Sequence, residues 1–159
     1  MAELTEAMLQ SMGPAKALAI AVYGESVAAY RYKVLAEKAL TAAHSKLFNE
    51  MAEEESGHRD LVQNLMRQHF GDVDFVLTPA DKELVTVGTR TFEVTDHASF
   101  EKAMQLMYDS ERRTGNYYRT LHRFLASHEL APLLKSMAAE CFEHAGRLRD
   151  IKPPDHSEP

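Results

Sequence analysis

Hydrophobic residues recur every three or four positions along most of this chain, the spacing that places side chains on one face of an α-helix. Pro14 suits the first turn of a helix, and Gly71 suits the position just after one, so both indicate helix boundaries. Thr95 or Asp96 is a candidate N-cap for a later helix. Four long amphipathic helices are therefore predicted, at about residues 14–43, 43–70, 96–125 and 127–151.

The helical pattern breaks between residues 71 and 95, where glycine and proline interrupt the sequence. Connections between bundle helices usually have about 2–8 residues, whereas this one is long enough to cross the whole bundle. Such a crossing would leave the second and third helices parallel. Within the connection we expect a short helix near residues 80–84 and extended backbone at Val76, Phe92 and Val94.

The predicted fold class is all-α, a four-helix bundle with one long crossover between helices 2 and 3. Residues 1–13 are expected to form an N-terminal lead segment and residues 14–151 the bundle. Two prolines end the last helix, so residues 152–159 are predicted to be a disordered tail.

Composition and charge limit the classes of function. At 159 residues, with 45% hydrophobic and 26% charged residues, the chain fits a single globular domain. A net charge of −6 and the lack of a long basic run argue against nucleic acid as a partner. No apolar run approaches the ~20 residues of a membrane span, and the acidic N-terminus does not resemble a signal peptide. We therefore expect a cytoplasmic protein with no membrane partner.

Charged or ionisable side chains interrupt each apolar stripe. In the second helix, Glu55 and His58 share a face with Met51 and Val62, which should be core. Burying an unpaired carboxylate is expensive, so such a group normally has a partner or a metal ion. The other three helices each have one such interruption: Glu25, Glu111 and His144.

The second pair of helices repeats the first with a constant offset of 86 residues. Glu25 and His58 are 33 residues apart, and so are Glu111 and His144. Several matches that share one offset favour a duplicated helical hairpin. The matched positions are 25 and 111, 32 and 118, 51 and 137, and 58 and 144.

This layout indicates a pair of metal ions. One Glu from each of two helices and a Glu-x-x-His from each of the other two form the ligand set of ferritin-like di-iron and di-manganese proteins. Mixed oxygen and nitrogen ligands with open positions suit iron, with manganese as the alternative, and leave room for dioxygen or peroxide. Two divalent ions would also let several carboxylates share a core without forcing one another to protonate.

Two motifs resemble the rubrerythrin family. Gly24-Glu25-Ser26, with Ala28 and Arg31-Tyr32, is similar to the first-helix motif of that family. Glu55-Ser56-Gly57-His58, after Glu53-Glu54, is similar to its second-helix motif. The resemblance covers about residues 14–150. It implies a ferritin-like bundle with a di-iron site, a homodimeric assembly, and reduction of hydrogen peroxide as the activity. It implies metal ligands at Glu25, Glu55, His58, Glu111 and His144, and a tyrosine beside the site, a catalytic candidate, at Tyr32.

The second half departs from the family pattern at two positions. Thr114 stands where the third helix usually has a second Glu, and Cys141 stands where the fourth helix should begin its Glu-x-x-His. Glu140 is the nearest carboxylate and a candidate ligand, because residues four apart, here Glu140 and His144, share a helix face. Cys141 is more often a small buried hydrophobe, with a thiolate ligand to iron as the alternative. We expect a dinuclear site if Glu140 turns inward, and one metal or none if it does not.

The leading hypothesis is a di-iron carboxylate oxidoreductase that uses hydrogen peroxide or dioxygen to oxidise Fe(II), with water as product. A single cysteine leaves no rubredoxin module, so the electron donor is expected to be a separate protein. Among the six candidate ligands, Glu55, and Glu140 if it reaches inward, would bridge the two ions. Glu25 and Glu111 would be terminal ligands. His58 and His144 would each bind one ion.

Three other interpretations stay open. The polar positions could be ordinary interruptions with local partners, in a bundle that serves as a binding or structural module and in which Tyr32 and Tyr118 simply pack. Iron storage or delivery with ferroxidase activity is a second interpretation. Hydroxylation of a small molecule is a third, because one fold hosts several chemistries. Glu53 and Glu54 are expected to be solvated.

Overall fold

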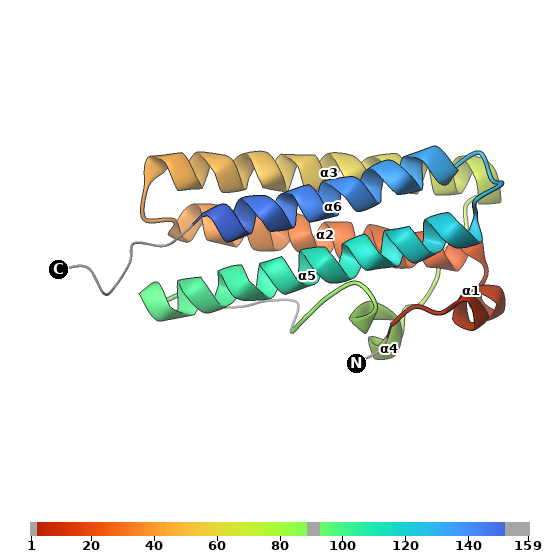
Figure 1. Ribbon diagram of the computed structural model, residues 1–159, viewed down its shortest axis with the longest axis horizontal. Helices are drawn as coiled ribbons and strands as arrows, with labels where there is room; N and C mark the ends of the chain where they lie inside the picture. Colours follow the sequence, from red (N-terminus) through yellow and green to blue (C-terminus); the bar gives the residue numbers. More distant parts are fainter. Residues whose placement is uncertain (1–2, 89–92, 152–159) are drawn as a thin grey trace.

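The computed structural model describes residues 3–88 and 93–151. Within these ranges it contains helices and no strands, and its four long helices form a bundle (Figure 1). This confirms the predicted all-α, ferritin-like four-helix architecture. The long helices are α2 (Pro14–Lys38), α3 (Ala42–Phe70), α5 (His97–Phe124) and α6 (Ala131–Asp150), and the short ones are α1 (Glu6–Met12) and α4 (Pro79–Glu83).

Two helix boundaries differ from the prediction by a few residues. Helix α2 ends at Lys38 because Thr41 is the N-cap of the next helix, its Oγ1 accepting a hydrogen bond from the amide of His44. Helix α6 begins at Ala131, three or four residues later than predicted, with Pro132 in its first turn, where a missing N–H is no loss.

The long connection crosses the bundle as predicted. Helices α3 and α5 run in the same direction in Figure 1, and α2 and α6 run in the opposite direction. The crossover therefore returns from one end of the bundle to the other, and α4 forms in its first half. The extended backbone predicted at Phe92 and the tail predicted at residues 152–159 lie outside the described residues.

The hydrophobic core has two parts, one toward each end of the bundle. One part contains Leu18, Val62, Leu121 and Leu134, and the other contains Leu35, Phe48, Phe100 and Leu148, among other buried residues. The buried glutamates and a buried histidine are in neither part, so a polar belt separates two apolar layers. Burial of these layers from water stabilises the bundle and fixes the level at which the polar side chains lie.

Over the part of the chain that the structure describes, no helix is long and apolar enough to cross a membrane.

Candidate metal centre

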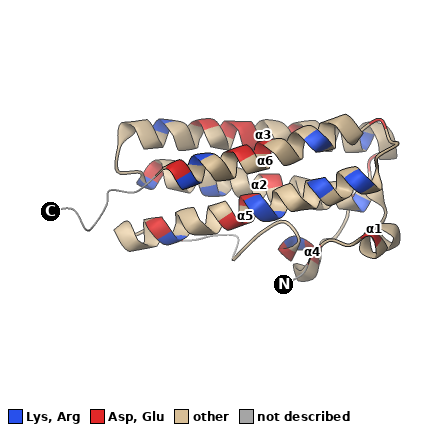
Figure 2. Cartoon of the chain, viewed as in Figure 1, with Lys and Arg blue, Asp and Glu red and all other residues tan. Residues whose placement is uncertain are grey.

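Acidic and imidazole side chains from all four long helices meet near the middle of the bundle. Figure 2 shows acidic segments at a similar level along each of these helices. Five of the six predicted ligands are buried or nearly so, and they come from α2 (Glu25), α3 (Glu55 and His58), α5 (Glu111) and α6 (His144). The three glutamates are only 1–4% exposed. Helical spacing places these groups on inward faces, as the sequence predicts.

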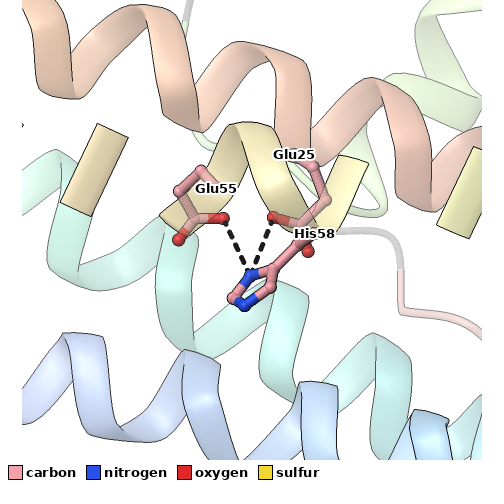
Figure 3. Close-up of side chains that lie close together, drawn as sticks. All are labelled: Glu25, Glu55 and His58. Atoms are coloured by element: carbon pink, nitrogen blue, oxygen red, sulfur yellow. Dashed lines mark ion pairs between the residues drawn. The ribbon is translucent and has the colours of Figure 1, made fainter. Parts of the chain in front are cut away.

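These five side chains form two groups of three that share Glu55. One group is Glu25, Glu55 and His58, and the other is Glu55, Glu111 and His144. In each group the candidate ligand atoms lie within 4.8 Å of one another. Figure 3 shows the first group, in which the carboxylates of Glu25 and Glu55 face the same ring nitrogen of His58. Glu55 is therefore the carboxylate that two ions would share if each group held one.

Both histidines present Nδ1 to the carboxylates. His58 Nδ1 lies 3.9 Å from Glu25 Oε2 and 3.9 Å from Glu55 Oε2. His144 Nδ1 lies 2.6 Å from Glu55 Oε1 and 3.5 Å from Glu111 Oε1. The two rings are nearly parallel, with centroids 6.2 Å apart. Each group thus offers one imidazole nitrogen and two carboxylates, a set that suits iron or manganese.

Two buried tyrosines cross the bundle to the terminal carboxylates. The Tyr32 hydroxyl donates to Glu111 Oε1 at 2.7 Å, and the Tyr118 hydroxyl donates to Glu25 Oε1 at 2.8 Å. Tyr32 and Tyr118 are related by the 86-residue offset, as are Glu25 and Glu111. Each half of the duplication therefore supplies the hydrogen-bond donor for the other half. Tyr32 lies beside the site, where the family resemblance placed it.

The outer nitrogens of the two histidines are also held across the bundle. His58 Nε2 pairs with Glu140, and His144 Nε2 lies 2.7 Å from Glu54 Oε2. Arg147 Nη1 forms an ion pair with Glu54 Oε2 at 3.4 Å. Glu54 was expected to be solvated, and this was wrong in part, since its half-exposed side chain contacts a buried histidine. The offset of 86 residues relates Glu54 to Glu140, and this was the sequence signal that could have found it.

Glu140 lies outside both groups of three. Its carboxylate contacts the outer nitrogen of His58, and its side chain is 42% exposed. Carboxylates in this position orient a metal-binding histidine and select its tautomer. Direct coordination by Glu140 stays a prediction. The expectation that two ions require Glu140 to turn inward left out Glu55, which belongs to both groups of three without Glu140.

Cys141 and Thr114, the two departures from the family pattern, have different surroundings. Cys141, the single cysteine of the chain, is buried, and the offset makes it the counterpart of Glu55 in the second half. Burial raises the pKa of its thiol well above the usual range, and the charges of Glu111 and Glu25 raise that pKa further. Thr114 donates from Oγ1 to the carbonyl oxygen of Val85 at 2.9 Å.

The sequence of this chain matches a known protein family. A protein-family model described as Rubrerythrin matches residues 16–151, which is most of the chain. The chain belongs to the rubrerythrin family. No curated protein and no solved structure matches it. The resemblance stated from the two helix motifs is thereby confirmed, and the rubrerythrin family is a di-iron, ferritin-like family.

The carboxylates of this rubrerythrin-family site do not share one protonation state. Burial raises the pKa of Glu25 well above its usual range, and the charge of Glu55 raises it further. Burial also raises the pKa of Glu111 to about 7, and Glu55 adds to that rise. Burial acts to raise the pKa of Glu55 too, but hydrogen bonds from Glu25 and His144 outweigh it and lower that pKa below the usual range. Glu55 is therefore the carboxylate that stays ionised.

His144 takes the charge that balances Glu55. Burial acts to lower the pKa of His144, but hydrogen bonds to Glu111 and Glu55 outweigh it and raise that pKa to about 11. The pKa of His58 is also raised, because hydrogen bonding and charge from Glu55 outweigh its burial. Without metal, bound protons lower the negative charge of the cluster, which would otherwise contain several ionised, buried carboxylates.

The donor set fits two divalent cations in rubrerythrin fashion. Without a counter-charge, buried carboxylates hold protons. A pair of cations would supply that counter-charge and let the carboxylates ionise. Nδ1 of each histidine is free to lose its proton, because the outer nitrogen keeps a carboxylate partner in Glu140 or Glu54. Two cations would be held by the three buried glutamates and two histidines: Glu25, Glu55, Glu111, His58 and His144.

Replacing Tyr118 with phenylalanine should lower the free energy of unfolding of the metal-free protein by about 1–3 kcal/mol, because the buried carboxyl of Glu25 loses its donor. Tyr32→Phe should have a similar effect through Glu111. Urea unfolding at one pH measures both. Tyr30→Phe is the matched control, since Tyr30 is 44% exposed. A loss in Tyr118→Phe no larger than in Tyr30→Phe would contradict the expectation.

The metal-free protein should become less stable as the pH rises from about 5 to about 9. Between its ordinary pKa of 4.5 and its raised value of about 7, Glu111 holds a proton only in the folded state. His144 likewise holds a proton only in the folded state between its ordinary pKa of 6.5 and its raised pKa of about 11. The folded state thus binds more protons than the unfolded state, so stability falls with pH. Glu55, with its lowered pKa, contributes fully above about pH 5.

Thermal unfolding in the presence of a chelator measures this trend. Metal-loaded protein should show the opposite dependence, because the ligands must lose protons to bind metal. A melting temperature that rises between pH 5 and pH 8 in chelator would be inconsistent with the protonated cluster.

Proposed function

We propose that this chain binds two iron ions and uses them to reduce hydrogen peroxide, or dioxygen, to water. The observation that supports the proposal most directly is the pair of three-residue groups that share buried Glu55. Each group has one imidazole and two carboxylates, which leaves positions open for a small oxidant. Manganese is the alternative metal, because its oxygen and nitrogen preferences overlap with those of iron.

When bound, two ferrous ions would supply two electrons, so that one hydrogen peroxide and two protons give two water molecules and two ferric ions. Dioxygen would need four electrons and four protons to give water, so the electron donor would have to supply a second pair of electrons. The protein's part is to hold the ligands, place hydrogen-bond donors and exclude bulk water. The apolar layers above and below the belt keep water from entering along the bundle axis. A separate electron-donor protein would return the iron to the ferrous state.

Named side chains divide this work. Tyr32 keeps its hydroxyl proton directed at Glu111, and Tyr118 keeps its own directed at Glu25, so both terminal carboxylates have a fixed orientation. Burial raises the pKa of both tyrosine hydroxyls well above the usual range, so they remain donors at neutral pH. Glu140 and Glu54 hold the outer nitrogens of the histidines.

Anaerobic titration with Fe(II), followed by addition of hydrogen peroxide, tests the proposal. Uptake should saturate near two ions per chain, and one peroxide should then oxidise two Fe(II). The absorbance of Fe(III) and an assay of remaining peroxide measure the ratio. Absence of uptake would overturn the proposal and leave the binding or structural module, an interpretation that Cys141 and the backbone bond of Thr114 favour.

Iron storage is separated from peroxide reduction by two further readings. Storage requires assembly into a shell, whereas the proposed enzyme is a homodimer, so size-exclusion chromatography distinguishes the two. Storage also needs no preference for peroxide over dioxygen. Equal rates with both oxidants, together with a large assembly, would favour iron handling instead.

A further inference from the structure

A small chamber adjoins the carboxylates of the proposed metal centre. Glu25, Glu55 and Glu111 line it, and neither histidine does. Its volume is about 10 Å³, which is space for roughly one water molecule. The remaining walls come from α2, α5 and the crossover, and nearly all lining residues are buried.

The crossover closes one side of this chamber. Val85 and Thr86, which follow α4, line it and are 1% and 8% exposed. Gly24 of α2 allows this close approach, because a Cβ added at Gly24 would lie 3.0 Å from Val85 Cβ. The glycine beside Glu25 in the first-helix motif therefore has a packing reason in this chain.

Hydrogen bonds from α5 hold the crossover in place. Thr114 Oγ1 donates to the carbonyl oxygen of Val85 at 2.9 Å, and the amide of Val87 donates to Ser110 Oγ at 3.1 Å. Arg113 Nη1 donates to the carbonyl oxygens of Glu83 and Thr86, each at 3.0 Å. Thr114 and Ser110 also line the chamber, and Thr114 is the one that bonds to Val85, whose side chain packs against Gly24.

We propose that Thr114 holds the crossover closed over the carboxylates and so limits the oxidant to molecules of two heavy atoms. The inference rests on the proposed function, which it deepens by naming the size of the substrate. An alkyl hydroperoxide would have to displace Val85, whose side chain packs against Gly24 and whose carbonyl is bonded to Thr114. A molecule of two oxygen atoms needs little more space than the chamber already has.

This role also accounts for the departure of Thr114 from the family pattern. The carbonyl of Val85 is buried, and a buried carbonyl without a donor costs free energy. A glutamate at position 114 would be ionised when it binds metal and could not donate to that carbonyl. A threonine at position 114 therefore gives up a carboxylate ligand for the metal and supplies the donor that keeps the crossover closed.

Three variants on α5 test the closure. Thr114→Val keeps the shape of the side chain and removes the donor, and Thr114→Ser restores a hydroxyl. Thr120→Val is the matched control, because Thr120 is half-buried on the same helix and does not line the chamber. The first readout is amide hydrogen exchange of residues 84–87 in the metal-free full chain, measured by mass spectrometry. Exchange should be roughly tenfold faster in Thr114→Val and near wild type in the other two.

The second readout is the rate of Fe(II) oxidation in iron-loaded protein by hydrogen peroxide and by tert-butyl hydroperoxide. Wild type should prefer hydrogen peroxide, and Thr114→Val and Val85→Ala should each reduce that preference by roughly tenfold. Wild-type protein that reacts equally with both oxidants would overturn the inference and leave the proposed function intact. Iron-loaded protein that reacts with neither would overturn the proposed function, and unchanged exchange in Thr114→Val would independently overturn the closure.

Discussion

Replacing Glu55 with glutamine is expected to abolish binding of both metal ions at once. Glu55 belongs to both groups of three, whereas Glu25 and Glu111 each belong to one. Loss of an outer partner alone costs about 10–100-fold in metal affinity, so loss of a bridging ligand should cost at least about 100-fold at both positions. Glutamine keeps the size of the side chain but is a weaker, uncharged ligand. Anaerobic Fe(II) titration of purified protein measures the stoichiometry.

Three further variants complete this comparison. Glu25→Gln and Glu111→Gln should each reduce the stoichiometry from about two ions per chain to about one. Glu53→Gln is the control, because Glu53 is exposed on the same helix as Glu55 and should bind metal like wild type. If Glu55→Gln retained one tightly bound ion, Glu55 would not be the shared ligand and the two groups would be independent.

Replacing Cys141 with glutamate should have opposite effects on the metal-free and metal-loaded protein. Cys141 is offset by 86 residues from Glu55 and lies close enough to Glu25, Glu55 and Glu111 for their charges to raise its pKa. Without metal, a fourth buried carboxylate should lower the free energy of unfolding by about 3 kcal/mol, since it lacks a partner. With metal, the same carboxylate should complete the duplicated ligand set and tighten binding.

Thermal unfolding with chelator and with Fe(II) measures both effects. The increase in melting temperature on metal addition should be larger in Cys141→Glu than in wild type. Cys141→Ser is the matched control, because it adds no charge and changes the volume little. Metal binding that is unchanged or weaker in Cys141→Glu would show that position 141 does not face the ions.

One asymmetry of the site underlies both expected results. The offset pairs the tyrosines, the terminal glutamates, the histidines and their outer carboxylates. The exception is Glu55, whose counterpart is Cys141. The duplicated hairpin therefore has one carboxylate at this pair of positions, where an exact repeat would give two. We expect that single difference to weaken the binding of a second ion.

The sequence by itself determined the helices and the polar belt. Helical spacing depends on local geometry, so the period of apolar residues identified α2, α3, α5 and α6 and the inward direction of five candidate ligands. The length of the connection determined that α3 and α5 are parallel, because a short loop could not span the bundle. Helix ends were predicted less well, since Thr41 ends one helix by starting another.

Only the tertiary structure decided which atoms meet. Spacing along a helix gives the face of a residue but not the rotamer or the partner on a neighbouring helix, so Glu140 and Glu54 could not be assigned to the outer histidine nitrogens beforehand. The same holds for Thr114, whose hydroxyl reaches a carbonyl 29 residues away on the crossover. Contacts of this kind depend on how the crossover packs against two helices, a property of the whole fold and not of any local stretch of sequence.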